Sequence, residues 1–285
     1  MILEQFGHIC RMIKIEHSIF ALPWAWAGSF LAANGLPPLA ELFLLTIAMV
    51  AIRSFAMTFN RLADMEFDRQ NQRTAKRPLL TGAISVKQAW LFSGLTAAVF
   101  VAACWALNWV CLLLSIPALA FAAAYSLLKR FTPLCHYWLG ATLGLAPLAG
   151  WLAVNPAYPG LPSVMLFLAV TFWVGAFDIY YAFQDQDFDV KMGLHSMPAD
   201  LGSHTAMVLA AFSHTNTVIF LILTGITASL GWPWYVLCAA IAVLLLYEHR
   251  LVNPDDLKNI NMAFFTMNGI ISPLVLLGVI LGIYI

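Results

Sequence analysis

The sequence predicts an all-α protein, a polytopic membrane helical bundle of about nine transmembrane helices. Composition and hydropathy lead to this prediction. Of the 285 residues, 62% are hydrophobic and only 10% are charged, with a mean hydropathy of +0.84, whereas soluble domains carry about 25% charged residues. A chain so poor in charge cannot cover a soluble globule of this size. We treat residues 1–285 as a single integral membrane domain whose surroundings are the lipid bilayer.

Nine apolar segments approach the length of about 20 residues that a transmembrane helix needs. They are 18–34, 39–59, 87–107, 109–128, 134–154, 163–183, 205–229, 233–248 and 260–283. On one side the connections are short and marked by turn-forming Pro, Gly and Asn. The other side carries the N-terminal segment and two longer polar loops, 60–86 and 185–204. The N-terminal segment lacks the cleavage pattern of a signal peptide, so we expect the first apolar run to be a retained span.

The charged residues predict the orientation of these spans. With the N-terminus inside, all 14 Lys and Arg residues fall on the inner side or at the inner ends of spans, and among the acids only Glu41 lies outside. This is an extreme positive-inside bias. It predicts a cytoplasmic N-terminus and active site and an outer C-terminus, as in a bacterial inner-membrane protein. The zero net charge gives no sign of nucleic-acid binding, and no obligatory protein partner is evident.

The longest polar stretch between apolar runs, Phe59–Gly82, carries eight charged residues. Within it Asn60, Asp64 and Asp68 are spaced by four, so they share one face if the preceding span continues as a helix. The same pair of acids recurs 121 residues later as Asp185 and Asp189. We therefore expect two pseudo-repeated halves that bring their acidic loops together.

The second acidic group extends upstream. Asp178 lies seven residues before Asp185 and shares its face, whereas Asp187 points elsewhere. Like charges spaced by four repel each other, and at the end of a membrane span they also cost desolvation. A divalent cation accounts for two such groups, because Mg²⁺ takes oxygen ligands and binds one or two carboxylates together with substrate phosphates.

Basic residues accompany both acidic groups. Arg73, Arg77 and Lys191 follow them closely, and Lys129 lies beside Arg130 on another inner loop. Carboxylates for a metal together with Arg and Lys for phosphate oxygens are typical of a metal-diphosphate site. The alternative is that these bases are solvated loop charges that follow the positive-inside rule.

Arg53 lies within a span, seven residues before Asn60 on the same helix face. An Arg in a span costs about 2.5–3.5 kcal/mol on insertion scales, which makes it a functional candidate. It is suited to holding a substrate carboxylate through two hydrogen bonds, or else it reaches the interface or pairs with Asp64. Other polar residues in the spans are expected to form interhelical hydrogen bonds: His136, His214, Asn216, Asn261 and Asn268.

At these motifs the sequence resembles the UbiA superfamily of intramembrane prenyltransferases. The family pattern NxxxDxxxD is similar to Asn60–Asp68, and the second family motif is similar to "DIYYAFQDQDFDVKMGLHSMPADLG", beginning at Asp178. "YSLLKRFT", from Tyr125 to Thr132, resembles a third family segment. One departure is "GLHS", where His195 stands in place of the basic residue of many aromatic prenyltransferases in the family.

The resemblance implies transfer of a polyprenyl group from polyprenyl diphosphate to an aromatic acid, with Mg²⁺ as cofactor. The acidic groups would bind the metal and the diphosphate, and the bases would bind the diphosphate. Arg53, Tyr125 and Tyr181 would bind the acceptor. Asp178 would orient the acceptor or help remove its ring proton. The implied metal ligands are Asn60, Asp64, Asp68, Asp185 and Asp189. The implied catalytic acids are Asp64, Asp68, Asp178, Asp185 and Asp189. The implied diphosphate ligands are Arg73, Arg77, Lys129 and Lys191.

The resemblance is greatest to the 4-hydroxybenzoate polyprenyltransferase-like members of quinone biosynthesis, in the ubiquinone and menaquinone routes. A naphthoate acceptor in the futalosine route to menaquinone is an open alternative. A membrane transporter is the alternative outside the enzymes, because intramembrane charges and repeated halves also suit transport. Against a transporter, the acids cluster at the inner ends of the spans and not at the midplane.

Overall fold

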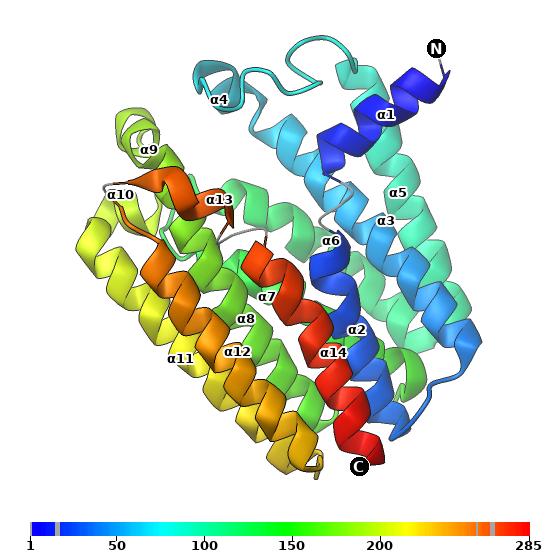
Figure 1. Cartoon of the computed structure of the whole chain (residues 1–285). Coiled ribbons are helices and arrows are strands. Elements are labelled where there is room, and N and C mark those ends of the chain that lie inside the picture. The colour runs from blue at the N-terminus through cyan, green and yellow to red at the C-terminus, as the bar shows by residue number, and fades with distance from the viewer. Residues whose placement is uncertain (1, 15–17, 255, 263–265) are drawn as a thin grey trace.

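The computed structural model describes residues 2–14, 18–254, 256–262 and 266–285, which form an all-helical bundle (Figure 1). The helices are α1 (Ile2–Ile13), α2 (Ser18–Ala33), α3 (Leu39–Ala63), α4 (Met65–Gln70), α5 (Val86–Leu107), α6 (Trp109–Leu128), α7 (Cys135–Val154), α8 (Leu161–Ala182), α9 (Gln186–Met192), α10 (Met197–Leu201), α11 (Ser203–Thr227), α12 (Trp232–Leu251), α13 (Ile260–Met262) and α14 (Asn268–Tyr284), with 3₁₀ turns η2 (Phe183–Asp185) and η3 (Leu257–Asn259).

Each of the nine predicted apolar segments contains a long helix, which confirms an all-α membrane bundle. In the described part of the chain, seven helices are long and apolar enough to cross a membrane. The apolar helices α2 and α14 are shorter, with 16 and 17 residues. The predicted last span, 260–283, begins too early, because α13 ends at Met262 and α14 starts only at Asn268. Residues 263–265 and the Asn261 side chain lie outside what the structure describes.

Helix α1 was not predicted from the sequence. It contacts α3, and Met12 and Ile13 at its end are buried in a small cluster with Leu79, Ile84 and Ala89. A helix this short derives its stability from packing an apolar face rather than from propensity. It covers the C-terminal part of α3.

Side-chain caps begin the two helices that follow the first polar loop. Ser85 and Gln88 form a reciprocal capping box at the start of α5, which satisfies two otherwise free backbone N–H groups. The Asn108 side chain accepts from the Cys111 N–H at 2.9 Å to cap α6, and donates to the Leu152 oxygen of α7 at 2.9 Å. This one residue therefore sets the turn between α5 and α6 and joins it to α7.

Helices α2 and α7 pack with their backbones in close contact. A Cβ atom on Gly150 would lie 1.8 Å from the backbone oxygen of Ala25, and one on Gly28 would lie 2.0 Å from that of Pro147. Ser29 of α2 donates to the Gly150 oxygen at 3.0 Å. Small residues that allow such approach and hydroxyls that bond across it are typical of helix pairs in membranes.

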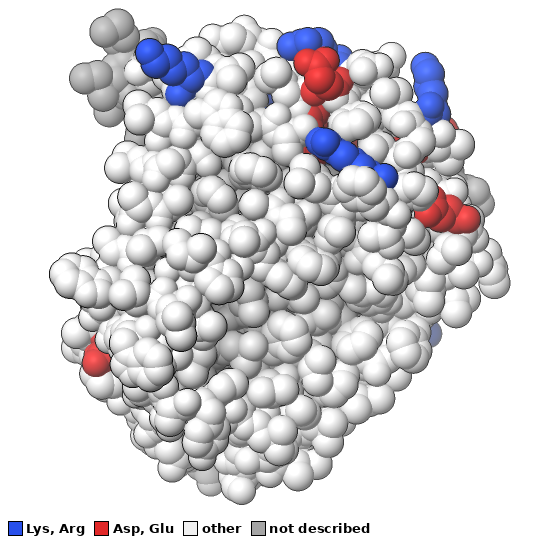
Figure 2. Space-filling model, turned by 180° about the vertical axis from the view of Figure 1, so that it is seen from behind, with Lys and Arg blue, Asp and Glu red and all other residues white. Residues whose placement is uncertain are grey.

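Polar and apolar residues are separated along the bundle axis. On the face in Figure 2, most blue and red side chains gather at the upper end, which carries α1, α4 and α9 in Figure 1, and the body below is almost uncoloured. The N-terminal end of the chain lies at this charged end and residue 285 at the opposite one (Figure 1). The bundle is thus an apolar body with its charge concentrated at one end.

We predict that Gly150→Ala destabilises the bundle. The added methyl would overlap the Ala25 backbone, and overpacking of this kind costs about 1–3 kcal/mol. The midpoint of thermal unfolding of the purified protein in detergent should fall. Gly94→Ala in α5 is the matched control, because no atom lies within 4 Å of its added Cβ; it should leave the midpoint unchanged or raise it. Equal midpoints for the two variants would contradict the close α2–α7 contact.

Candidate active site

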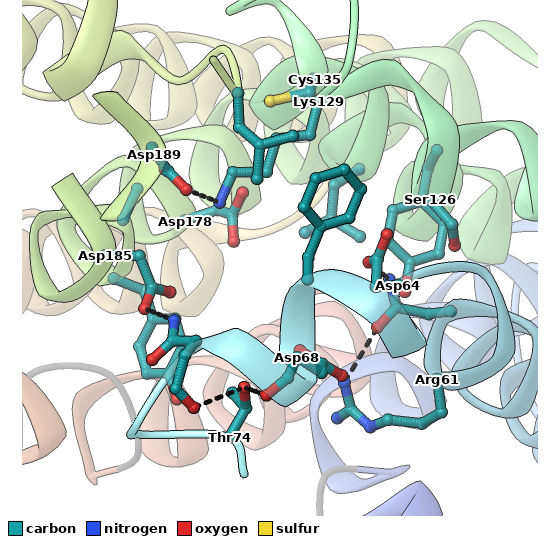
Figure 3. Close-up of a pocket in the computed structure, with 18 of the residues that line it drawn as sticks. Arg61, Asp64, Asp68, Thr74, Ser126, Lys129, Cys135, Asp178, Asp185 and Asp189 are labelled. Atoms are coloured by element: carbon teal, nitrogen blue, oxygen red, sulfur yellow. Dashed lines mark hydrogen bonds and ion pairs between the residues drawn. The ribbon is translucent and has the colours of Figure 1, made fainter. Parts of the chain in front are cut away.

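A cavity of about 300 Å³ opens at the charged end of the bundle, between α3–α4, the α6–α7 corner and α8–α9 (Figure 3). Five aspartates line it, together with basic, aromatic and amide side chains. In Figure 3, Asp178, Asp185 and Asp189 lie on one side with Lys129, and Asp64 lies with Arg61 on the other. The two acidic motifs, distant in sequence, therefore face one another across a single cavity.

The first motif spans a junction between two helices. Helix α3 ends at Ala63 and α4 begins at Met65, with Asp64 between them. The Asp64 N–H still donates to the Asn60 oxygen at 2.9 Å and the Asp68 N–H to the Asp64 oxygen at 2.8 Å. The helical pitch therefore continues through the junction, and all three side chains line the cavity. The Asn60 amide donates to the Asp64 carboxylate at 2.8 Å.

The second motif follows the end of α8. Asp178 lies in α8, Asp185 ends the 3₁₀ turn η2, and Asp189 lies in α9. Asp185 is 8% exposed and Asp189 is fully buried, whereas Asp187 is exposed. As predicted from the sequence, Asp178, Asp185 and Asp189 line the cavity and Asp187 does not. The tighter 3₁₀ turn was not predicted, but it keeps Asp185 and Asp189 on the cavity side.

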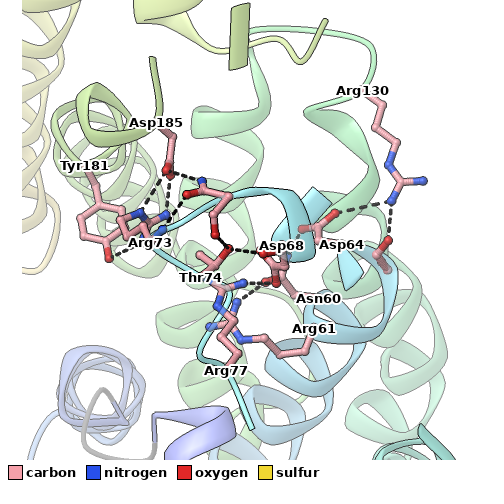
Figure 4. Close-up of polar contacts among 12 residues, drawn as sticks. Asn60, Arg61, Asp64, Asp68, Arg73, Thr74, Arg77, Arg130, Tyr181 and Asp185 are labelled. Atoms are coloured by element: carbon pink, nitrogen blue, oxygen red, sulfur yellow. Dashed lines mark hydrogen bonds and ion pairs between the residues drawn. The ribbon is translucent and has the colours of Figure 1, made fainter. Parts of the chain in front are cut away.

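Each acid of the two DxxxD pairs contacts a basic side chain. Figure 4 shows the contacts of Asp64, Asp68 and Asp185, and Figure 3 that of Asp189. Asp68 pairs with Arg77 and Asp185 with Arg73. The Lys129 Nζ lies 2.8 Å from Asp189, and Arg130 lies 3.5 Å from Asp64 while donating to the Ala63 oxygen at 2.7 Å. Buried carboxylates need such partners, because an unpaired charge loses its hydration without compensation.

Arg73 joins the two halves of the site. From the loop after α4 it bonds both carboxylate oxygens of Asp185 and donates to the Tyr181 hydroxyl at 3.1 Å. Its guanidinium also lies over the Tyr181 ring, 5.2 Å from the centroid. Asn71 of the same loop donates to Asp185 at 2.8 Å. Asn71 had no distinguishing sequence signal, since it lies between two motifs and matches neither.

The electrostatics of the cavity follow from burial and crowding. Burial, and then the neighbouring charge of Asp68, raises the pKa of Asp64 above its ordinary value. Burial lowers the pKa of Lys129, but the Asp189 carboxylate outweighs it and the net shift is upward. Lys129 is therefore held as a cation. The anionic form of Asp64 is disfavoured by burial and by Asp68, so the approach of another cation would stabilise that carboxylate.

Asp178 contacts a histidine instead of a base that is always charged. His136 of α7 places its Nδ1 atom 2.6 Å from an Asp178 oxygen, and both residues line the cavity. The interhelical hydrogen bond expected of His136 is thus present. Asn268 likewise accepts from Trp173 at 2.7 Å, whereas Asn216 bonds within its own helix and both His214 nitrogens are buried without a partner.

Most of the predicted site residues line this cavity, but not all of them. Tyr125 and Tyr181 do, together with all the predicted acids and Asn60. In the described part of the chain, Arg53 and Lys191 are not lining residues: Arg53 donates to the Ile13 oxygen at 3.1 Å, and Lys191 is exposed on α9. His195 lies 2.9 Å from Asp200. Arg61, which was not predicted, is buried and donates to Asn60 at 2.9 Å.

The carboxylate and amide side chains at the cavity supply hard oxygen donors, the kind that Mg²⁺ and Ca²⁺ take. Carboxylates of Asp64, Asp68, Asp185 and Asp189 and the amide of Asn60 all line the same space. Within the described residues no three acidic, His or Cys side chains converge as a metal-binding group, because each carboxylate is turned toward its basic partner. The donor chemistry fits a divalent cation.

Comparisons with known proteins bear on this site. The model of the UbiA prenyltransferase family matches residues 21–270. A 4-hydroxybenzoate octaprenyltransferase of Xanthomonas oryzae pv. oryzae (strain PXO99A) is 34% identical over 269 residues, covering 94% of this chain and 89% of that protein. The apo structure of a UbiA homolog from Aeropyrum pernix K1 has a TM-score of 0.84 at 34% identity, covering 93% of this chain and 98% of that one.

A second solved structure shares the fold. It is a UbiA homolog from Archaeoglobus fulgidus bound to GPP and Mg²⁺, with a TM-score of 0.75 at 24% identity, covering 98% of this chain and 100% of that one. The helical fold of the chain is therefore shared with that protein.

We predict that Lys129→Met destabilises the protein by about 3–5 kcal/mol, because it leaves the buried Asp189 carboxylate without its partner. Adding Asp189→Asn should restore part of the loss, since the second change removes the uncompensated charge. Thermal unfolding in detergent measures both effects. Lys258→Met, which removes a mostly exposed ion pair with Asp256, is the control and should cause no measurable loss. If the losses of stability caused by Lys129→Met and Asp189→Asn simply add in the double variant, the result would contradict the ion pair between these two residues.

Proposed function

The chain belongs to the UbiA prenyltransferase family and is an integral membrane prenyltransferase; from this premise we propose that it transfers a polyprenyl group from polyprenyl diphosphate to 4-hydroxybenzoate in a Mg²⁺-dependent reaction of quinone biosynthesis. The acceptor follows the named activity of the Xanthomonas relative, and Mg²⁺ follows the ligand of the Archaeoglobus homolog. The transporter hypothesis is set aside, because the family is one of enzymes.

One observation carries the proposal: the aspartates of both motifs and three of the predicted diphosphate-binding bases line one cavity at the charged end of an apolar bundle. A prenyl diphosphate has the complementary form, with a charged head and a hydrocarbon tail. The head would lie among Arg73, Arg77 and Lys129, and the tail among the apolar helices below. A site at this end also agrees with the proposed orientation, in which it faces the cytoplasm of a bacterial cell.

Bond breaking requires stabilisation of the leaving group. The allylic C–O bond ionises when charge on the diphosphate oxygens is met by fixed cations in a site that excludes water. Arg73 and Arg77 supply charge-assisted hydrogen bonds, and Lys129 supplies a point charge. Tyr125 and Tyr181 line the cavity, and their ring faces would stabilise the allylic cation.

The metal would be held by Asn60, Asp64, Asp68, Asp185 and Asp189. When bound, Mg²⁺ neutralises charge that develops on the leaving diphosphate. Lys191 would contact the diphosphate from α9. Three of these acids, Asp68, Asp185 and Asp189, are now paired with bases that would bind phosphate. Metal and diphosphate together would therefore replace the contacts of both partners without leaving a charge unpaired.

The acceptor would lie deeper than the diphosphate. We assign its carboxylate to Arg53, which would exchange its hydrogen bond to the Ile13 oxygen for this contact, and its ring to the neighbourhood of Tyr125 and Tyr181. Asp178 would accept the ring proton. Arg53 is preferred as an anion partner because a planar guanidinium matches a carboxylate with two hydrogen bonds.

Asp64→Asn and Asp185→Asn should each lower transfer at least about 100-fold, because each removes negative charge from the proposed metal and diphosphate site. The measurement is formation of prenylated product by purified protein with Mg²⁺ and both substrates. Asp187→Asn is the control, since Asp187 lies in the same segment but is exposed, and it should retain normal turnover. Near-normal turnover of either cavity variant, folded in the membrane, would overturn the metal assignment.

Removal of divalent metal with EDTA should abolish transfer, and added Mg²⁺ should restore it. In a competition between acceptors, 4-hydroxybenzoate should be prenylated in preference to a dihydroxynaphthoate, with prenyl diphosphates of several lengths as donors. Product identity is read by mass spectrometry. Prenylation of the naphthoate alone would replace the proposed acceptor by that of the futalosine route, while leaving prenyl transfer itself intact.

A further inference from the structure

Asp178 differs from the other four cavity aspartates in its partner. Asp64, Asp68, Asp185 and Asp189 each lie within ion-pair distance of Arg or Lys. Among the described residues no Arg or Lys lies within 4.0 Å of Asp178, whose contact is His136. Asp178 also keeps 26% of its side chain exposed at the cavity. It is therefore the cavity acid that has no Arg or Lys in direct contact, although Lys129 acts on it at longer range.

The hydrogen bonds of His136 determine its tautomer. The backbone N–H of Met197 donates to His136 Nε2 at 3.2 Å, so Nε2 is an acceptor and the ring proton lies on Nδ1. That Nδ1–H then donates to Asp178 Oδ2 at 2.6 Å. His136 is 2% exposed, so water does not compete for either bond. One carboxylate oxygen is occupied by this bond, and the other remains available to the cavity.

The helix geometry places Asp178 deeper in the bundle than Asp185. It precedes Asp185 by seven residues, mostly along α8, which corresponds to about 10 Å along a helix axis. Both line the same cavity. In a transfer reaction the acceptor lies beyond the allylic carbon, on the side opposite the leaving diphosphate. Asp178 lies deeper along α8 than Asp185, on the side where we place the acceptor.

We propose that His136 is a positioning residue for Asp178, which acts as the proton acceptor of the transfer reaction; the inference rests on the proposed function. The allylic C–O bond breaks and its electron pair leaves with diphosphate. A ring carbon of the acceptor forms the new C–C bond, and its C–H electrons then return to the ring while the proton passes to the free oxygen of Asp178. His136 holds the carboxylate in the orientation that receives it.

The same imidazole also holds the loop that follows the second motif. Its Nε2 receives the Met197 N–H, and two residues earlier the His195 N–H donates to the Lys129 oxygen at 2.7 Å. The Cys135 thiol lies 3.6 Å from the His195 oxygen. A purely structural role of His136 would therefore act through Met197, whereas the proposed role acts through Asp178.

Two substitutions separate these roles. An Asn side chain places its amide nitrogen near the position of imidazole Nδ1, so His136→Asn keeps a donor for Asp178 and loses the acceptor for Met197. A Gln side chain reaches the position of Nε2, so His136→Gln keeps an acceptor for Met197 and loses the donor. We expect kcat to fall at least about tenfold in His136→Gln and less in His136→Asn. A tenfold loss is a fraction of the rate enhancement that a general base usually contributes.

The decisive readout is the isotope effect with acceptor deuterated at the ring carbon that is prenylated. In the unmodified protein proton loss follows bond formation quickly, so the effect on kcat should be small. It should rise in His136→Gln and in Asp178→Asn, because proton removal becomes slow, and it should stay small in His136→Asn. The double variant His136→Gln with Asp178→Asn should be no slower than Asp178→Asn alone.

His214→Gln is the matched control for burial, since His214 is 5% exposed and lies outside the cavity. Thermal unfolding first shows that each variant is folded. The control should then change neither kcat nor the isotope effect. If His136→Asn is as slow as or slower than His136→Gln, or if no isotope effect emerges in His136→Gln, the positioning role is overturned. Absence of prenyl transfer by the unmodified protein would instead overturn the proposed function.

Discussion

The site depends on one electrostatic constraint: a carboxylate buried at the end of an apolar bundle must have an opposite charge in contact. Each pair that meets this requirement joins two different elements. Arg77–Asp68 closes the loop after α4 onto that helix, Arg73–Asp185 ties the same loop to η2, and Lys129–Asp189 joins the end of α6 to α9. Charge pairing thus determines the path of the polar loops, and the loops in turn enclose the cavity.

Close helix packing supports this arrangement from below. A Cβ atom on Gly140 would lie 2.1 Å from the Thr171 oxygen, so α7 and α8 approach with their backbones in contact. This approach brings His136 to Asp178, 42 residues later in the chain. Because the two helices cannot separate without losing that packing, the contact between imidazole and carboxylate is held by the scaffold rather than by a flexible loop.

The sequence predicted the parts of the fold that depend on hydropathy and motif spacing. Nine apolar runs have the length and composition of spans, and the repeated spacing of Asp64–Asp68 and Asp185–Asp189 required that the two loops meet. Helix α1 and the junction between α3 and α4 at Asp64 could not be predicted, because both depend on tertiary contacts with α3 and the cavity. Arg53 illustrates the limit: its position on a helix face was predictable, but its bond to the Ile13 oxygen depends on where α1 packs.

The pairing pattern also explains how five aspartates in one cavity can have different roles. Four of them are paired with Arg or Lys, and on the proposed function metal and diphosphate would enter together, so that the acids exchange one cation for another and the bases exchange one anion for another. Each charged group would then keep an opposite charge in contact before and after binding. Asp178 takes no part in this exchange, because its partner His136 bonds it as a neutral donor through Nδ1. Its second carboxylate oxygen therefore stays available to the cavity, which is what a proton acceptor for the aromatic ring requires.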